Sequence, residues 1–297
     1  MADLAAPGSV RRLFLDPENK IENLALRLYT LAPREFKKGD EERAGKRAGY
    51  QAMAQRCGAP ESALPAEEKS LAEELINRQE RLIEQAGARG FGPWKMKLSA
   101  NLTCGLSTPT IFENGMTLLR PYGIPLLPSS SIKGVLEAWL AELLKGKFHL
   151  SEKEQTAVLK RYGMLEILGS EDAPGRVIFL DALPFPLHLE TDLTTVHYQK
   201  WYSEGLAPGG WESPIPVYFI TFGKGTVLHF GFIQSRSIDW APIRDELQPV
   251  ASILSDWDIK RLDSPADFLK DLLDSAGRYK GFGSQTAQGY GRMEPCA

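Results

Sequence analysis

Three serines and a lysine come together where a helix is expected to begin. Pro125 and Pro128 favour an extended approach, and Ser129, Ser130, Ser131 and Lys133 follow them directly. Free backbone N–H groups at a helix start, serine hydroxyls and an ammonium group are groups that bind phosphate. The same residues could supply only a helix cap and a surface lysine, and the pattern by itself favours that simpler interpretation.

A second segment is rich in glycine and ends in an arginine. Gly281, Gly283, Gly289 and Gly291 precede Arg292, and glycine permits both unusual dihedral angles and a close approach of backbone to ligand. The segment contains neither of the common nucleotide-binding glycine patterns, GxGxxG and GxxxxGK[ST]. It could therefore be a purely conformational connection between a helix and a terminal strand.

A third segment interleaves aromatic and basic residues: His197, Tyr198, Lys200, Trp201 and Tyr202. Aromatic rings beside cations can stack on the bases of single-stranded RNA. They could equally form the small core of an ordinary loop. His197, helped by Tyr198 and Lys200, could also act as a general base, although a single histidine in an aromatic loop is more often structural.

Neither a metal nor a cofactor is expected. The four histidines show no HxH or HExxH spacing, and Cys57, Cys104 and Cys296 form no CxxC pair. The sequence shows no nucleophile elbow, kinase signature or Cys-His signature.

Hydrophobic periodicity predicts the elements that position these segments. Helical spacing predicts helices over 13–31 and 65–85, and strict alternation predicts a strand over Trp94–Cys104. A short strand is expected over 177–180, and the runs 217–222 and 226–233 are expected to form a hairpin. Ser264 and Pro265 predict the start of a further helix. The predicted class is α+β, with helices on one face of a largely antiparallel sheet.

Composition limits the possible functions. The chain has 297 residues, is 43% hydrophobic and 25% charged, and carries a formal net charge of −3. These values are typical of a folded protein and exclude a global positive field, so any RNA binding must come from a local surface. The expected location is the cytoplasm, because no signal peptide is found, no apolar run is long enough to cross a membrane, and the cysteines suit a reducing compartment.

The order of several motifs resembles the RAMP superfamily of CRISPR proteins. The segment 113–134 (ENGMTLLRPYGIPLLPSSSIKG), the segment 192–202, PIPVYF at 214–219 and the terminal glycine loop carry the resemblance. Within the superfamily, they are most similar to the family of sixth subunits of the type III-B Cmr complex. The similarity runs from about Trp94 to the end of the chain.

The resemblance implies an RRM-like (ferredoxin-like) RAMP core with insertions. We therefore expect an N-terminal helical extension over 1–92 and a core over 93–297 with an inserted segment at about 183–216. The family further implies a non-catalytic subunit that caps the backbone filament near the 3′ end of the guide RNA. The implied partners are guide RNA, target RNA, the backbone RAMP subunit, the small helical subunit and the neighbouring RAMP subunit, with no membrane.

The expected RNA-facing positions follow from these segments. At the helix start and in the glycine-rich segment they are Ser129, Ser130, Ser131, Lys133, Gly134, Lys280, Gly281, Gly283, Ser284, Gln285, Thr286, Gly289, Tyr290, Gly291 and Arg292. The expected RNA or partner contacts are His197, Tyr198, Lys200, Trp201 and Tyr202.

Departures from the family pattern weaken the expected RNA site. Ser129 follows Pro128 where glycine is usual, Glu137 stands where arginine is usual, and Gln285 replaces a usual lysine. Each change reduces flexibility or positive charge. Two alternatives stay open: an endoribonuclease that processes guide RNA with His197, and a scaffold that binds only protein.

Overall fold

A computed structural model describes residues 3–4, 33–34, 66–108, 114–119, 121–170, 172–196, 201, 204–205, 207 and 215–296. The central sheet is antiparallel, with the strand order β11 (Met293–Pro295), β3 (Gly90–Leu98), β10 (Val227–Gln234) and β6 (Val177–Phe179). Strand β7 (Leu183–Pro184) also pairs with β10.

Two helices connect the strands of this sheet. Helix α5 (Ser129–Lys145) follows β3, and α11 (Pro265–Ser275) follows β10. Among the four strands of the path β11-β3-β10-β6 and these two helices, the order along the chain is β3, α5, β6, β10, α11 and β11, with shorter elements between them. Side chains such as Met96, Leu140 and Phe268, all fully buried, fill the core between sheet and helices. The predicted α+β class is confirmed.

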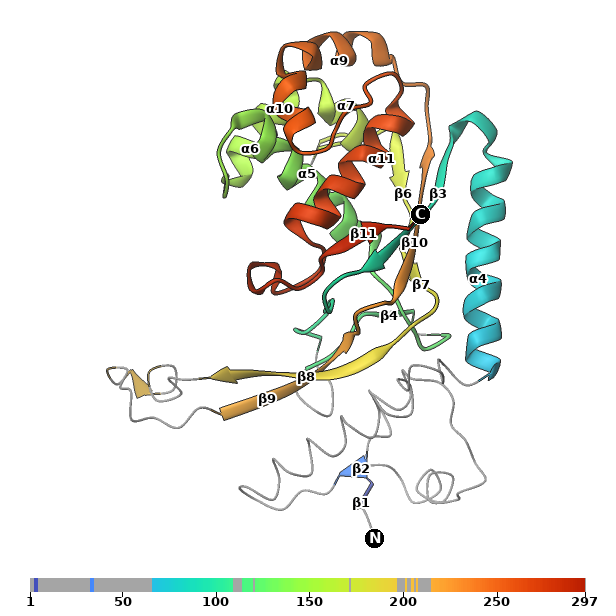
Figure 1. Cartoon of the computed structure of the whole chain (residues 1–297), viewed down its shortest axis with the longest axis vertical. Helices are drawn as coiled ribbons and strands as arrows, with labels where there is room; N and C mark the ends of the chain where they lie inside the picture. Colours follow the sequence, from blue (N-terminus) through green and yellow to red (C-terminus); the bar gives the residue numbers. More distant parts are fainter. Residues whose placement is uncertain are drawn as a thin grey trace.

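Shorter elements surround this unit (Figure 1). The helices are α6 (Glu152–Arg161), α7 (Met164–Leu168), α9 (Trp240–Leu247) and α10 (Ala251–Asp256), with helical turns η1 (Gly87–Arg89), η2 (Gln248–Val250), η3 (Ala276–Lys280) and η4 (Thr286–Gln288). The two-stranded pairs are β1 (Asp3–Leu4) with β2 (Pro33–Arg34), β4 (Leu118–Leu119) with β5 (Ile124–Pro125), and β8 (Leu189–Val196) with β9 (Ile215–Phe222).

Helix α4 (Ala66–Gln85) lies against the opposite face of the sheet from α5 and α11, so the expectation of helices on one face only is wrong (Figure 1). Two glycines permit its close approach. A Cβ atom built on Gly90 would lie 2.1 Å from the carbonyl oxygen of Ile83, and one on Gly231 would lie 2.2 Å from Cδ1 of Ile83. On the same face, Nδ1 of His229 lies 3.5 Å from Oε1 of Glu80, and burial lowers the pKa of His229.

Several sequence predictions of single elements are confirmed. The predicted helix over 65–85 corresponds to α4, and the Oγ of Ser264 accepts the backbone N–H of Asp267 at 3.1 Å as the predicted N-cap of α11. The strand predicted from Trp94 instead begins at Gly90 and ends at Leu98, because the N–H groups of Ser99 and Ala100 both turn to the carbonyl oxygen of Arg292.

The predicted hairpin is wrong. The two runs do form β9 and β10, but β9 pairs with β8 over its whole length, whereas β10 enters the central sheet beside β3. The predicted helix over 13–31 lies outside the described residues. Within the described part of the chain, no helix has both the length and the apolar character needed to cross a membrane.

Candidate nucleic-acid interface

The start of α5 is capped by a carboxylate rather than by one of its own serines. Pro128 occupies the N-cap position without a side-chain cap, and the backbone N–H of Ser129 donates to Oδ1 of Asp181 at 2.7 Å. Ser130 is exposed and Ser131 is half-buried. The simpler interpretation, in which a serine caps the helix, is therefore wrong. The hydroxyl groups of Ser130 and Ser131 are not used as caps, but one of the amide groups expected to bind phosphate already has an anionic partner.

The lysine of this segment also has a partner. Nζ of Lys133 lies 3.5 Å from Oε1 of Glu137, one helical turn later, and both side chains are partly exposed. Glu137 is one of the departures from the family pattern. Partial burial raises the pKa of Glu137, and Lys133 opposes that shift. Lys133, the residue expected to bind phosphate, is thus paired with a carboxylate of its own helix. The neighbouring Gly134 is exposed, with open space where a Cβ atom would lie.

Three of the four glycines in the C-terminal loop are required by internal packing. Cβ atoms built on Gly281, Gly283 and Gly291 would lie 2.7, 2.3 and 1.8 Å from the carbonyl oxygens of Tyr290, Thr103 and Phe282. All three residues also have positive φ angles. These glycines therefore allow backbone to meet backbone within the protein.

Gly289 differs from the other three. It is exposed, has a φ of +93°, and a Cβ atom built on it would meet nothing within 4 Å. It follows the turn Thr286–Gln288, which Gln285 enters with a φ of +58°. Gly289 is thus the glycine of this loop around which a ligand has room.

Lys280 serves the fold. Its Nζ lies 2.8 and 2.7 Å from the two carboxylate oxygens of Glu142, a residue of α5 that is only 2% exposed. A buried carboxylate must be paired to be tolerated, so this ammonium group balances an internal charge. Its predicted contact with RNA stays a prediction, with the ammonium group already engaged.

Arg292, at the end of the loop, is the opposite case. Its Nη1 lies 3.4 Å from the carbonyl oxygen of Arg278, and no carboxylate among the described residues pairs with it. Partial burial lowers the pKa of Arg292 because the surroundings disfavour its charged form. An anion at this position would supply the missing partner.

Tyr290 ties the loop to the β8–β9 ribbon. Its hydroxyl donates to Oδ2 of Asp192 on β8 at 2.5 Å. Burial, and then the neighbouring carboxylate, raise the pKa of Tyr290. The phenol therefore holds the loop in place as a neutral donor.

The chain beyond β3 brings the two predicted RNA-facing segments together. The carbonyl oxygen of Thr103 accepts the N–H of Ser284 at 2.7 Å, and the Sγ of Cys104 donates to the carbonyl oxygen of Leu126 at 3.2 Å. Leu126 lies three residues before Ser129. Adjacent residues of one strand extension thus contact the glycine-rich loop and the approach to α5.

The structure describes only one of the five predicted contact residues in the aromatic segment. His197, Tyr198, Lys200 and Tyr202 lie outside the described residues, and Trp201 is 50% exposed. Within the described residues, no group of three or more histidine, cysteine or acidic side chains is arranged to hold a metal ion.

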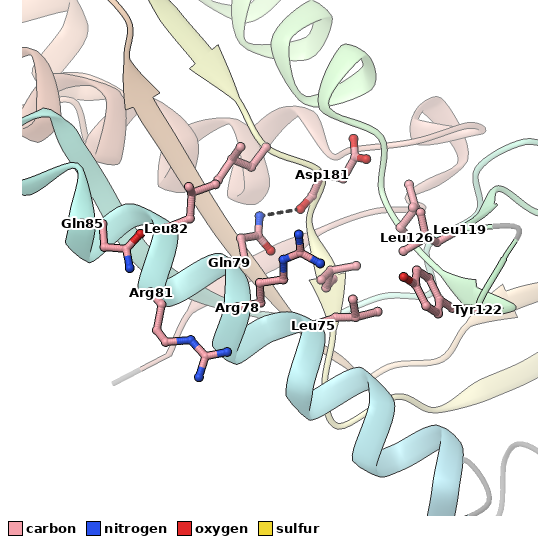
Figure 2. Close-up of a pocket in the computed structure, with 12 residues that line it drawn as sticks. Leu75, Arg78, Gln79, Arg81, Leu82, Gln85, Leu119, Tyr122, Leu126 and Asp181 are labelled. Carbon is pink, nitrogen blue, oxygen red and sulfur yellow. Dashed lines mark hydrogen bonds between the residues drawn. The ribbon is translucent and has the colours of Figure 1, made fainter.

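Sequence reasoning missed three residues that line a groove beside α4: Arg78, Arg81 and Tyr122 (Figure 2). The two arginines lie on the exposed side of a predicted amphipathic helix, where such residues are usually solvated. Of the three, only Tyr122 has a local signal in the sequence, because it stands directly before Gly123 in a segment typical of a turn.

Comparison with known proteins places this core in a family. The model of the RAMP superfamily matches residues 92–294. A protein of Pyrococcus furiosus, "CRISPR system Cmr subunit Cmr6", is 27% identical over 183 residues, which cover 44% of this chain and 54% of the relative. The corresponding Cmr6 subunit of Saccharolobus solfataricus is 29% identical over 142 residues, covering 46% of this chain and 42% of the relative. The chain thus spans about half the length of these curated relatives.

A solved structure shares the fold. A chain in the cryo-EM structure of the type III-B Cmr-beta complex bound to cognate target RNA aligns with a TM-score of 0.54 and 20% identity, covering 89% of this chain and 76% of that chain. The family model contains the strands of the central sheet from Gly92 onward, the start of α5 and the glycine-rich loop. The chain therefore belongs to the RAMP superfamily, and its curated relatives are Cmr6 subunits of CRISPR systems.

Proposed function

We propose that this chain is a non-catalytic, RNA-contacting subunit of a type III-B CRISPR (Cmr) interference complex that caps the backbone filament near the 3′ end of the guide RNA. Its partners would be guide and target RNA, the backbone RAMP subunit, the small helical subunit and the neighbouring RAMP subunit. Homology to Cmr6 supports the complex. The observation that carries the RNA contact is the guanidinium of Arg292, which pairs with no carboxylate among the described residues and lies in the same loop as the open Gly289.

The contacts would be with the sugar-phosphate backbone. Arg292 supplies a positive charge, Ser130 and Ser131 present hydroxyl groups in the first turn of α5, and Gly134 leaves open space in the next turn. Such contacts fix the position of an RNA without reading its bases. Because Lys133 and Lys280 each pair with a carboxylate, the subunit would bind RNA weakly alone and depend on its protein partners.

The test is nuclease protection of guide RNA in the reconstituted complex. Arg292→Glu should expose the 3′ end of the guide while the subunit still assembles, and Lys133→Glu should have a smaller effect in the same direction. Arg236→Glu is the matched control, because Arg236 is exposed and lies outside both segments. Unchanged protection with Arg292→Glu, at unchanged melting temperature, would contradict the RNA contact and favour a scaffold that binds only protein.

The non-catalytic role has its own test. The purified chain should not cleave repeat-derived or target RNA in the absence of metal, and His197→Ala should leave target cleavage by the complex intact. Loss of a general base would instead lower a cleavage rate by about 10²- to 10⁴-fold. Cleavage by the isolated chain that disappears in His197→Ala would establish the processing enzyme.

A further inference from the structure

A groove of about 480 Å³ lies between α4 and the β4–β5 turn. In Figure 2, Arg78 and Gln79 line it from α4, Tyr122 faces them from the turn, and leucines from both sides form its apolar walls. This volume is within the range of small-molecule sites, about 300 to 1,000 Å³. Helix α4 precedes the region that the family model matches, so the groove is formed jointly by the RAMP core and an element outside it.

The positive charges of the groove have no acidic partners within the described part of the chain. Arg78 and Arg81 are both exposed, and neither forms an ion pair with another described residue. Figure 2 shows Arg78 pointing into the groove, whereas the guanidinium of Arg81, also a lining residue, extends from α4 away from Tyr122. Two unpaired guanidinium groups beside apolar walls favour a ligand that carries negative charge and a flat apolar surface.

Two further groups fit a planar ligand with hydrogen-bond donors. Tyr122, which lines the groove, is 37% exposed. Oε1 of Gln79 is buried without a hydrogen-bond partner among the described residues, while its Nε2 donates to the carbonyl oxygen of Asp181 at 2.9 Å. A buried acceptor without a donor is uncommon in folded proteins, and an N–H group of a ligand would satisfy it.

Asp181 joins this groove to the predicted phosphate site. Its carbonyl oxygen holds Gln79, and its carboxylate accepts the first N–H group of α5 at 2.7 Å. The groove and the helix start are therefore neighbours.

We propose that the groove beside α4 binds one unstacked nucleotide of single-stranded RNA. The base enters beside Tyr122 and donates an N–H group to Oε1 of Gln79, and Arg78 and Arg81 neutralise the adjoining phosphates. The site rests on the proposed function, because it extends the RNA path from the start of α5 onto the N-terminal helix. RNA is favoured over a protein segment because three features match a nucleotide together. The aromatic ring matches a base, the arginines without an acidic partner among the described residues match its phosphates, and the acceptor without a described donor matches its N–H group.

The first experiment measures binding of the full chain to a fluorescein-labelled single-stranded RNA of about 12 nucleotides. Arg78→Glu with Arg81→Glu should weaken binding about tenfold or more and reduce the dependence of log K on log salt by about 0.7 for each phosphate that is no longer neutralised. Tyr122→Ala should weaken binding about fivefold or more, whereas Tyr122→Phe should retain it. Arg89→Glu is the control for each single charge reversal, Arg78→Glu and Arg81→Glu, because it reverses one charge in η1, outside the groove.

The second experiment maps cross-links in the assembled complex. Guide RNA containing 4-thiouridine should cross-link to Tyr122 or to α4, and Arg78→Glu should abolish that cross-link. Equal weakening by Arg89→Glu, or no weakening by the groove variants at unchanged melting temperature, overturns the proposal. Loss of assembly with the protein partners in the absence of RNA also overturns it, because the groove then holds a protein.

Failure of this site is distinguishable from failure of the proposed function. If Arg292→Glu reduces protection of the guide and the groove variants do not, the subunit contacts RNA elsewhere and the groove does not. If neither reduces it, the RNA-contacting role itself is wrong.

Discussion

The sequence predicts phosphate binding for both the glycine-rich loop and the start of α5, yet the two regions differ in structure. Most of the glycines and the lysine of the loop contact other parts of the protein, whereas those at the start of α5 are open or partly exposed. In the loop, Gly283 and Gly291 are closed in by backbone, and Lys280 pairs with the buried Glu142. At the start of α5, Gly134 is surrounded by open space, and Lys133 pairs with a partly exposed carboxylate. The loop is thus mainly a structural element with one outward cation, Arg292, whereas the helix start faces outward along its first turns.

This difference separates two reasons for placing glycine and lysine in a motif. A glycine with a carbonyl oxygen under 3 Å from its virtual Cβ is required by the fold, and a lysine on a buried carboxylate is required by charge balance. A residue without such a constraint is available to a ligand. The two regions can therefore be told apart by stability measurements before any RNA is added.

The largest effect is expected from Gly291→Ala. The new methyl group would lie 1.8 Å from the carbonyl oxygen of Phe282, at a residue with a φ of +73°. We expect a loss of about 4 kcal/mol or more, which would leave little folded protein. Soluble yield and thermal melting measure it. A normal melting temperature would mean that the loop can rearrange and is not the structural element described here.

The next effect compares the two lysines. Lys280→Ala leaves the Glu142 carboxylate buried without its partner and should cost about 3 kcal/mol. Lys133→Ala removes a partly exposed pair one turn apart and should cost about 0.5 kcal/mol or less. Denaturant unfolding of both variants provides the measurement. Equal costs would remove the distinction between the two regions.

A pH-dependent effect is expected from Tyr290. Its pKa is raised in the folded state, so above about pH 10 the unfolded chain releases a proton that the folded chain keeps. The stability that this hydrogen bond provides is therefore present below pH 10 and declines as the pH rises further. Tyr290→Phe should cost about 1 kcal/mol at neutral pH and show a shallower decline above pH 10. Parallel stability curves for the wild type and Tyr290→Phe would contradict the tie to Asp192.

The smallest effect has the opposite sign. Gly134→Ala places a methyl group in open space within an exposed part of α5, and should stabilise the free chain by about 0.5 to 1 kcal/mol. Thermal melting should show a rise of a few degrees. If the same variant reduces protection of guide RNA, the RNA occupies the space that the added methyl group fills. If it destabilises the chain, the start of α5 is constrained in the same way as the loop.

The sequence predicted elements well where the signal was local. Alternation located β3, and the Ser264–Pro265 pair located the start of α11, because each pattern lies within one element. Partners distant in the chain were not predictable. Lys280 and Glu142 are 138 positions apart, and the pairing of β9 with β8 rather than β10 depends on how the sheet is assembled.

The candidate site shows the same division. The glycines of the loop were found, but not that carbonyl oxygens surround three of them. The serine run was interpreted as a phosphate site or a cap, whereas Asp181, 52 positions after Ser129, takes the capping role. The sequence gives no signal for Arg78 and Arg81, because exposed arginines on a helix are common. Their place in the lining of a groove depends on elements that are distant in the chain.

The packing of α4 against the central sheet limits where this chain can be truncated. Ile76 of α4 forms an apolar cluster with Leu126 and Leu183, and Gly90 and Gly231 lie directly under Ile83. A chain cut at residue 92, where the family similarity begins, would leave those leucines without their cover and open one face of the sheet to water. Such a fragment should aggregate, since exposed apolar patches of this kind promote association. We therefore expect that the start of the family similarity, at residue 92, is not a boundary of folding in this molecule.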